Sequence, residues 1–265
     1  MKAILAALAI LLALSPAHAA RKDQAEQAIV YSQAAVGRAL PDVVFTDTEG
    51  QPVALRDYRG KPLLVTLIYT SCADVCPTLV ASLYPAVQAA MAALGPDSFN
   101  VITVGFDLRN DSPARLRSFA RTNGVDLPNW RFVATDEASL DALARAVGFG
   151  IYSRTGGFDH LAQVSVIDAE GRLRRQIYGA VFEPPVVVEP LKTLVFGRGE
   201  PVTSLERLVD RIRYFCTVYD PGSGRYYFDY SFFVLVTVGL MSFAAILAVL
   251  VREWRRSTAG GMGAG

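Results

Sequence analysis

Residues 63–77, which read LLVTLIYTSCADVCP, decide the fold of this chain. The run at 63–69 is almost entirely apolar, and such a run is typical of a strand that is buried on both faces of a sheet. Cys72 and Cys76 follow directly. Pro77 suits the first turn of a helix, where its missing N–H would have had no intrahelical partner. The stretch therefore predicts a central strand, a short turn that carries two thiols, and a helix.

Strands and helices are predicted to alternate along the rest of the chain. The glycine in the turn at 47–50 permits the positive φ that a tight hairpin needs. The pattern predicts, in order, strands at 43–45, 53–55 and 63–69, a helix from 77 toward 94 that Pro85 kinks or ends early, a strand at 100–106, a helix at 113–122, a strand at 131–133, a helix from the Asp136 cap to 147, strands at 163–168 and 172–178, and a helix at 187–196. This order predicts an α/β fold with a mostly parallel sheet, helices on both faces and a closing antiparallel pair.

A cysteine pair at the end of the first central strand resembles the arrangement of a thioredoxin-type fold. Cys76 would lie at or near the amino terminus of the following helix. The partial positive charge there favours a thiolate, which is both the nucleophile and the metal ligand.

The amino terminus has the features of a cleavable secretory signal peptide at 1–19. Lys2 supplies the positive charge, 3–14 the apolar region, and Ala17-His18-Ala19 the small-residue cleavage site. The alternative is a short membrane anchor, but about a dozen apolar residues are too few to cross a hydrocarbon core of about 30 Å. We therefore expect cleavage after Ala19.

The carboxyl-terminal region predicts one transmembrane helix. Residues 231–251 carry no charge, and about 20 such residues span a bilayer. Arg252, Arg255 and Arg256 follow at once, so the positive-inside rule places the carboxyl tail in the cytoplasm. With a secreted amino terminus, this topology predicts a single-pass protein of a bacterial inner membrane whose main domain faces the periplasm.

About two hundred residues separate these two segments, which is enough for one well-buried domain with an additional segment. The formal net charge is +1, and loss of Lys2 with the signal peptide would leave a neutral chain. This balance gives no support for nucleic-acid binding. The predicted organisation is a signal peptide at 1–19, an amino-terminal segment at 20–37, a thioredoxin-like domain at 38–196, a juxtamembrane segment at 197–229, a transmembrane helix at 230–251 and a cytoplasmic tail at 252–265.

The candidate site residues are two cysteines and one histidine. The chain has two histidines, and His18 lies in the predicted signal peptide, so His160 is the single imidazole of the mature chain. Cys72 and Cys76 are spaced i and i+4, so one turn can place both sulfurs on the same side. In a thioredoxin arrangement the loop of His160 lies beside the cysteine turn, although a lone loop histidine is more often a surface or structural residue.

Two thiolates and one imidazole, if they converge, favour copper and in particular Cu(I). Structural zinc would need a fourth protein ligand, for which Asp74, Asp107 and Asp159 are candidates, so zinc is disfavoured rather than refuted. Two other interpretations of the cysteine pair stay open. A permanent disulfide is ordinary in exported proteins, but closing so short a loop gains little stability. A catalytic redox dithiol is the other, although thioredoxin-like oxidoreductases have a two-residue gap between their cysteines.

Several motifs together resemble the Sco/SenC family of membrane-anchored copper proteins. The match runs over about 38–196 and includes Gly60-Lys61-Pro62, Tyr69-Thr70, Cys72-x-x-x-Cys76-Pro77, Phe106-Asp107, Asp111-Ser112-Pro113 and Asp159-His160. The resemblance implies a thioredoxin-like fold and copper held by Cys72, Cys76 and His160. It also implies a metallochaperone that matures the copper A centre of cytochrome c oxidase, by delivering copper, by reducing the acceptor's cysteines, or by both. Because that role needs reduced thiols, a periplasmic thioredoxin-like reductant is an implied partner.

Two features depart from the family pattern. Ala73 stands where family members usually have proline, and the anchor is carboxy-terminal instead of an amino-terminal helix or lipid. The main alternative function is a periplasmic thiol–disulfide oxidoreductase without a physiological metal, and copper sensing or buffering would use the same ligands.

The juxtamembrane segment holds the third cysteine. Cys216 could pair between chains, serve as an auxiliary thiol or lie buried and inert, and an inert or intermolecular role is favoured over catalysis. The tyrosines at 219–230 predict an interfacial aromatic belt.

Overall fold

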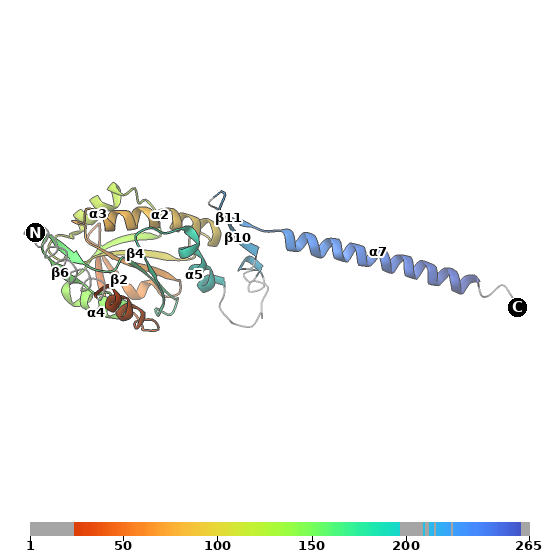
Figure 1. Cartoon of the computed structure of the whole chain (residues 1–265), viewed down its shortest axis with the longest axis horizontal. Coiled ribbons are helices and arrows are strands. Elements are labelled where there is room, and N and C mark those ends of the chain that lie inside the picture. The colour runs from red at the N-terminus through yellow and green to blue at the C-terminus, as the bar shows by residue number, and fades with distance from the viewer. Residues whose placement is uncertain (1–23, 197–208, 210–211, 215, 224, 261–265) are drawn as a thin grey trace, which may run out of the picture. The chain divides into compact units, whose positions relative to one another are not determined.

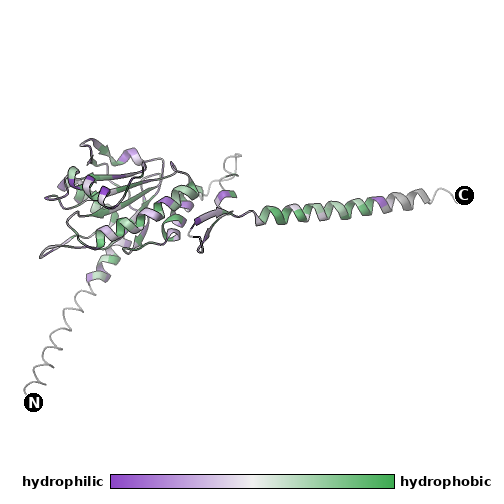
Figure 2. Cartoon of the chain, turned by 90° about the horizontal axis from the view of Figure 1, so that it is seen from above, coloured by the Kyte–Doolittle hydropathy of each residue, from purple (hydrophilic) through white to green (hydrophobic). Residues whose placement is uncertain are grey.

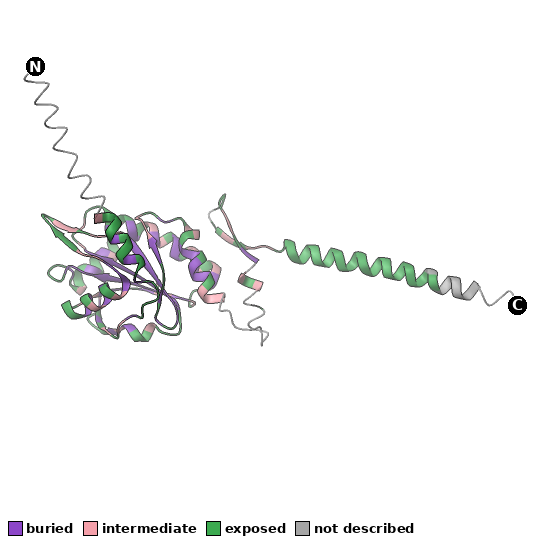
Figure 3. Ribbon diagram, turned by 60° about the horizontal axis from the view of Figure 1, so that its bottom comes forward, coloured by how far each residue is buried: buried purple, intermediate pink, exposed green. Residues whose placement is uncertain are grey.

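The computed structural model describes residues 24–196, 209, 212–214, 216–223 and 225–260 (Figure 1). At its centre lies β3 (Leu63–Ile68), and all of its residues are buried. Its neighbour β8 (Gln163–Ile167) is also buried throughout, and β4 (Asn100–Gly105) is buried in all but its first residue. In Figure 3 these buried strands lie in the interior, with helices around them. The apolar run therefore forms the central strand that the sequence predicts.

Seven strands make up the main sheet, in the order β2-β1-β5-β4-β3-β8-β9. The other four strands are β1 (Val44–Asp47), β2 (Pro52–Ala54), β5 (Trp130–Ala134) and β9 (Leu173–Tyr178). Only the β3–β4 and β4–β5 pairs are parallel, while the other four pairs are antiparallel. The prediction of a mostly parallel sheet is therefore wrong, because an antiparallel hairpin extends the three-stranded parallel centre on each side.

Helices cover both faces of this sheet. α2 (Val75–Leu94) packs against α5 (Pro184–Phe196). α4 (Glu137–Val147) and a helix at 24–33 lie on the other side (Figure 1). Two further helical elements among residues 24–196 are α3 (Pro113–Thr122), which packs on β5, and the 3₁₀ turn η1 (Leu55–Tyr58).

The predicted helix starts are confirmed by their caps. The Ser112 hydroxyl accepts a hydrogen bond from the Arg115 N–H at the start of α3. The Asp136 carboxylate accepts one from the Ser139 N–H at the start of α4. Each bond satisfies a backbone donor that has no partner within the helix.

The sequence predicts that Pro85 kinks α2 or ends it early. The helix does not end there but continues to Leu94. Pro85 lies on the exposed side of the helix, whereas Leu83 and Ala86 on either side of it are fully buried. Packing of this apolar face against the core outweighs the lost hydrogen bond at the proline.

Two short strands that the sequence does not predict precede His160. β6 (Tyr152–Arg154) and β7 (Gly157–Asp159) pair as an antiparallel hairpin. The β6 residues are all exposed, so they lack the alternation of apolar and polar residues that marks a half-buried strand.

The boundary between the two compact units of the chain falls between 211 and 212. The second unit contains the hairpin of β10 (Thr217–Asp220) and β11 (Arg225–Phe228), followed by α7 (Ser231–Gly260). α7 is mostly hydrophobic in Figure 2 and extends beyond the predicted span into the predicted tail. The predicted signal peptide at 1–19 lies outside the described residues.

Two helices among the described residues are long and apolar enough to cross a membrane. One is α2, whose buried face contributes to the core. The other is the segment Ser231–Arg252 of α7, which has a mean hydropathy of 2.7 and no buried residues. Only this second segment has the all-round apolar surface of a helix that contacts lipid.

Candidate metal centre

The two cysteines lie where β3 ends and α2 begins. Cys72 follows the strand in a short turn, and Cys76 is in the first turn of the helix. The Cys76 N–H donates a hydrogen bond of 3.4 Å to the Cys72 sulfur, so the turn brings the two residues into contact. Both thiols are free. Cys72 is partly exposed, whereas Cys76 is buried.

The two thiols have different acidities. Burial alone would raise the pKa of Cys72, but hydrogen bonds from the Cys76 and Asp74 backbone and from the Tyr69 hydroxyl outweigh it and lower the pKa. Burial raises the pKa of the Cys76 thiol far above its usual range, and the nearby Cys72 sulfur adds to the effect. The prediction that the helix amino terminus favours a thiolate at Cys76 is therefore wrong, because desolvation dominates there. Cys72 is the thiol that ionises first.

A buried carboxylate holds the cysteine turn in place. Asp111 accepts hydrogen bonds from the Thr70 N–H at 2.8 Å and from the Thr70 hydroxyl at 2.6 Å. Its other oxygen accepts one from the Asp107 N–H at 2.9 Å. A Cβ atom at Gly105 would lie 2.7 Å from the Asp111 Cβ, so only glycine leaves room for this side chain. Burial raises the pKa of Asp111, although its three donors oppose that shift.

His160 lies directly after β7, among aromatic rings. Its ring centroid is 5.2 Å from those of Phe106 and Phe149 and 5.8 Å from that of Tyr69. Nδ1 is 2.9 Å from the Leu161 carbonyl oxygen, and since a carbonyl only accepts, Nδ1 carries the hydrogen and Nε2 keeps the lone pair. Burial also lowers the pKa of His160, which favours the neutral ring that binds metals.

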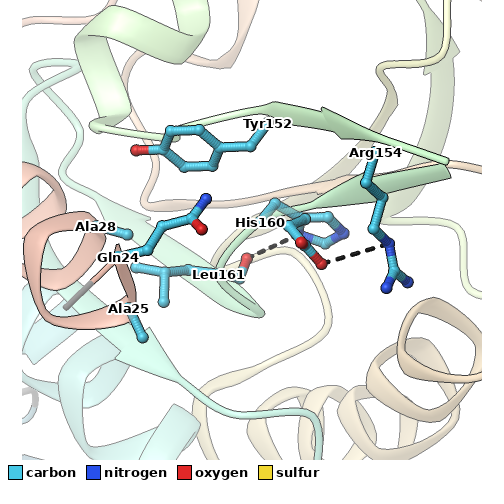
Figure 4. Close-up of a pocket in the computed structure, with 8 residues that line it drawn as sticks. Gln24, Ala25, Ala28, Tyr152, Arg154, His160 and Leu161 are labelled. Carbon is cyan, nitrogen blue, oxygen red and sulfur yellow. Dashed lines mark hydrogen bonds and ion pairs between the residues drawn. The ribbon is translucent and has the colours of Figure 1, made fainter. Parts of the chain in front are cut away.

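A pocket of about 240 Å³ borders His160 (Figure 4). It lies between the helix at 24–33 and the β6–β7 hairpin, and an ion pair of 3.4 Å joins Arg154 to Asp159 on the hairpin side. The lining residues are Gln24, Ala25, Ala28, Tyr152, Arg154, Asp159, His160 and Leu161. Asp159 is one of the three carboxylates that could complete a zinc site, and Arg154 already pairs with it. A second, Asp107, accepts a hydrogen bond from the Asn110 amide at 2.7 Å.

Tyr69 connects the two halves of the candidate site. Its hydroxyl is hydrogen-bonded to Cys72, and its ring contacts the His160 ring edge-on. Within the described part of the chain, no three His, Cys, Asp or Glu side chains are close enough to hold one metal ion. The structure therefore places Cys72 in contact with Cys76, and Tyr69 in contact with both Cys72 and His160. A site in which the two cysteines and His160 hold one ion together stays a prediction. Two thiols and a neutral imidazole are nevertheless a soft donor set that suits Cu(I).

Cys216 belongs to the second unit. It is buried and its thiol is free. Burial in apolar surroundings lowers the reactivity of a thiol, and an inert role for Cys216 stays a prediction.

The sequence patterns do not reveal a role for Asp111 or for the aromatic residues around His160. One signal was available for Asp111, because a carboxylate that follows a buried strand and directly precedes the Ser112 cap lies at the edge of the sheet. No local signal marks Phe149, which follows the Gly148 cap at the end of α4 and contacts the His160 ring.

Comparisons with known proteins agree on one family. Residues 35–195 match the family model described as SCO1/SenC. The SCO1 protein homolog of Bacillus subtilis (strain 168) is 24% identical over 144 residues, which cover 53% of this chain and 74% of that relative.

Similar solved structures include a putative electron transfer protein from Aquifex aeolicus VF5, with 28% identity, a TM-score of 0.55 and coverage of 63% of this chain and 97% of that one. ScoI of Bradyrhizobium japonicum with copper bound has 24% identity, a TM-score of 0.50 and coverage of 60% and 99%. BsSco, a member of the Sco family of cytochrome c oxidase assembly proteins, has 19% identity, a TM-score of 0.53 and coverage of 60% and 94%. The fold is thus thioredoxin-like, and because the family model covers more than half of its length, the chain belongs to the SCO1/SenC family.

Proposed function

We propose that this chain is a periplasmic, membrane-anchored copper protein that acts in cytochrome c oxidase assembly. It delivers copper to the copper A subunit, reduces the cysteines of that subunit, or does both. The observation that carries this proposal is the contact of Tyr69 with both Cys72 and His160. Family membership and the copper bound by ScoI of Bradyrhizobium japonicum support it.

In this proposal Cys72, Cys76 and the Nε2 atom of His160 hold the copper ion as cargo. The lowered pKa of Cys72 and the lowered pKa of His160 both favour the deprotonated form that binds a metal ion. Cys76 must lose its proton when copper binds. A ligand with a raised pKa gives the ion up more readily in exchange for a proton, and this property suits transfer to an acceptor.

The membrane topology is part of the proposal. Cleavage after Ala19 and a span within Ser231–Arg252 would leave the cysteine turn in the periplasm and the carboxyl tail in the cytoplasm. The apolar surface of that segment supports the anchor. The orientation rests on the arginines that follow it.

A second candidate function is thiol–disulfide exchange without a physiological metal, and the unequal acidity of the two thiols favours it. The Cys72 thiolate would attack a partner disulfide, form a mixed disulfide and release one partner thiolate. Cys76 would then lose its proton and attack the Cys72 sulfur, which releases the second partner thiolate. Two electrons pass to the partner and this chain becomes a disulfide. A periplasmic thioredoxin-like reductant would restore the dithiol.

Anaerobic copper titration of the reduced full-length chain in lipid nanodiscs tests the proposal. Cys216→Ser serves as the reference, because it removes the third thiol. We expect one copper ion per chain to survive challenge by a competing chelator. His160→Ala should weaken retention by at least about tenfold, and Cys72→Ser/Cys76→Ser should abolish it.

The same variants separate the two functions. If the reference retains no copper but still reduces a partner disulfide, and His160→Ala does so equally well, the copper proposal fails and the oxidoreductase function replaces it. If copper is retained, transfer to a purified copper A subunit is the next measurement.

A further inference from the structure

The β6–β7 hairpin, which leads to His160, is separate from the main sheet. Its strands pair with each other in a two-stranded sheet, and His160 follows the second strand directly (Figure 4). A hairpin of two strands is only marginally stable in water by itself. The position of the imidazole therefore depends on what attaches this hairpin to the rest of the domain.

One backbone N–H of β7 is available for such an attachment. The two-residue turn of the hairpin closes at the Arg154–Gly157 pair, and the next pair is Ser153–Phe158. Opposite residues in an antiparallel sheet alternate between pairs that exchange hydrogen bonds, as the pair at a tight turn does, and pairs that do not. The Phe158 N–H therefore points away from β6, and it donates a hydrogen bond to the Tyr69 hydroxyl.

The Tyr69 hydroxyl passes this connection on to the cysteine turn. It accepts the bond from Phe158 and donates one to the Cys72 sulfur, because a phenol has both a hydrogen to donate and lone pairs to accept with. Tyr69 follows β3 directly and is buried. Its carbonyl oxygen also accepts a hydrogen bond of 3.1 Å from the Cys72 N–H. A chain of hydrogen bonds thus runs from β7 to the turn.

The hairpin is fitted to this hydroxyl. A Cβ atom at Gly157 would lie 3.1 Å from the Tyr69 hydroxyl oxygen, so a larger residue would press on it. The Tyr69 ring packs edge-on against the rings of Phe158 and His160, with centroid distances of 5.3 and 5.8 Å. Ring packing brings the hairpin close, but only the hydroxyl joins it to Cys72 by a directional bond.

We propose that Tyr69 is a positioning residue, whose hydroxyl holds the β6–β7 hairpin on the cysteine turn and so fixes where His160 lies relative to Cys72. His160 is a proposed copper ligand, so the consequence for copper rests on the proposed function. The attachment of the hairpin does not rest on it, because the hydrogen bonds are those of the metal-free chain with reduced cysteines.

Hydrogen exchange of the metal-free, reduced full-length chain in nanodiscs tests the attachment. Cys216→Ser is the reference, and mass spectrometry at single-residue resolution follows the Phe158 amide. Tyr69→Phe keeps the ring and removes the hydroxyl, so we expect the Phe158 amide to exchange roughly fivefold faster, as for the loss of one hydrogen bond. Tyr152→Phe is a matched control, because it removes a hydroxyl from an exposed residue of the same hairpin and should leave this rate unchanged. An unchanged rate in Tyr69→Phe would overturn the inference.

Copper retention against a competing chelator then shows whether the attachment positions His160. Tyr69→Phe should weaken retention by roughly threefold or more in the reference but clearly less in the His160→Ala background, because the hydroxyl then has no ligand to position. A structural loss, or an effect through Cys72 alone, would be equal in both backgrounds and would overturn the inference. If the reference retains no copper, the copper function fails, while the exchange of Phe158 still decides whether Tyr69 holds the hairpin.

Gly157→Ala repeats the exchange measurement if Tyr69→Phe unfolds the domain. The added Cβ atom displaces the hydroxyl from the Phe158 N–H without removing it. The same faster exchange of Phe158 is expected, and an unchanged rate in this variant would count against the inference in the same way.

Discussion

Cys72 and Cys76 are four positions apart, yet hydrogen bonding lowers the pKa of the first and burial raises that of the second. Only the thiolate is nucleophilic. We therefore expect iodoacetamide to modify Cys72 before Cys76 in the reduced protein at neutral pH. Because its pKa is lowered, the Cys72 rate should approach its plateau at a lower pH than that of free cysteine.

Peptide mass spectrometry of samples alkylated at a series of pH values measures this order. Tyr69→Phe is a matched variant, since it keeps the ring but removes the hydroxyl hydrogen bond to Cys72. It should move the Cys72 profile to higher pH. Faster modification of Cys76 in the unmodified chain would contradict the assignment.

Asp111 stabilises the cysteine turn through its hydrogen bonds to Thr70 and Asp107. In Asp111→Asn, an amide oxygen can still accept from Thr70, but the amide nitrogen then faces the Asp107 N–H, which is also a donor. We expect a loss of about 1–3 kcal/mol in the free energy of unfolding, measured by denaturant titration. The Asp111 charge also raises the pKa of Cys76, so the variant should alkylate Cys76 at lower pH.

An unchanged free energy of unfolding in Asp111→Asn would show that the hydrogen bonds of Asp111 to Thr70 and Asp107 do not stabilise the cysteine turn. Asp97→Asn is a control for the loss of a carboxylate, because Asp97 is exposed and no hydrogen bond or ion pair of its side chain is found among the described residues.

At the scale of elements, the end of α4 is fitted closely to the helix at 24–33. Gly148 caps α4 with a φ of +61°, and a Cβ atom there would lie 2.7 Å from the Ser32 Cα and 2.8 Å from the Tyr31 carbonyl oxygen. Gly148→Ala should therefore lower the free energy of unfolding by more than about 2 kcal/mol, through both strain and steric overlap.

Gly124→Ala isolates the strain. Gly124 has a similar φ of +67°, but a Cβ atom would meet nothing within 4 Å. Thermal unfolding of the two variants should show the larger loss for Gly148→Ala. Equal losses would mean that the added Cβ atom at 148 causes no steric overlap with Ser32 and Tyr31 beyond the backbone strain.

At the scale of the whole molecule, the site and the membrane segment belong to different compact units. We expect a chain that ends at Phe196 to keep the thermal unfolding midpoint of the first unit and the alkylation order of its cysteines, because the sheet and its helices are complete without the second unit. The same truncation should abolish recovery of the protein in the membrane fraction. Calorimetry and fractionation measure the two effects, and a clearly lower midpoint would show that the units stabilise each other.

Much of the architecture could be predicted because it rests on local patterns. A few neighbouring residues are enough to predict each of these elements: the strand from the apolar run at 63–69, two helix starts from the caps at Ser112 and Asp136, and the long apolar helix from the uncharged stretch at 231–251. Capping depends on one side chain and the next turn, and burial of a strand depends on its own composition. The hairpins β6–β7 and β10–β11 could not be found in this way, because their strands are short and lack clear alternation.

By itself the sequence determined the central strand, the turn with its two thiols, the caps of α3 and α4 and the long apolar segment of α7. Only the tertiary structure decided that four of the six strand pairs are antiparallel, that Cys72 and not Cys76 has the lowered pKa, and that Asp111 holds Thr70. Hydrophobic pattern and residue spacing are properties of neighbours along the chain. Strand pairing, desolvation and hydrogen bonds to a buried carboxylate depend on residues that only the fold brings together.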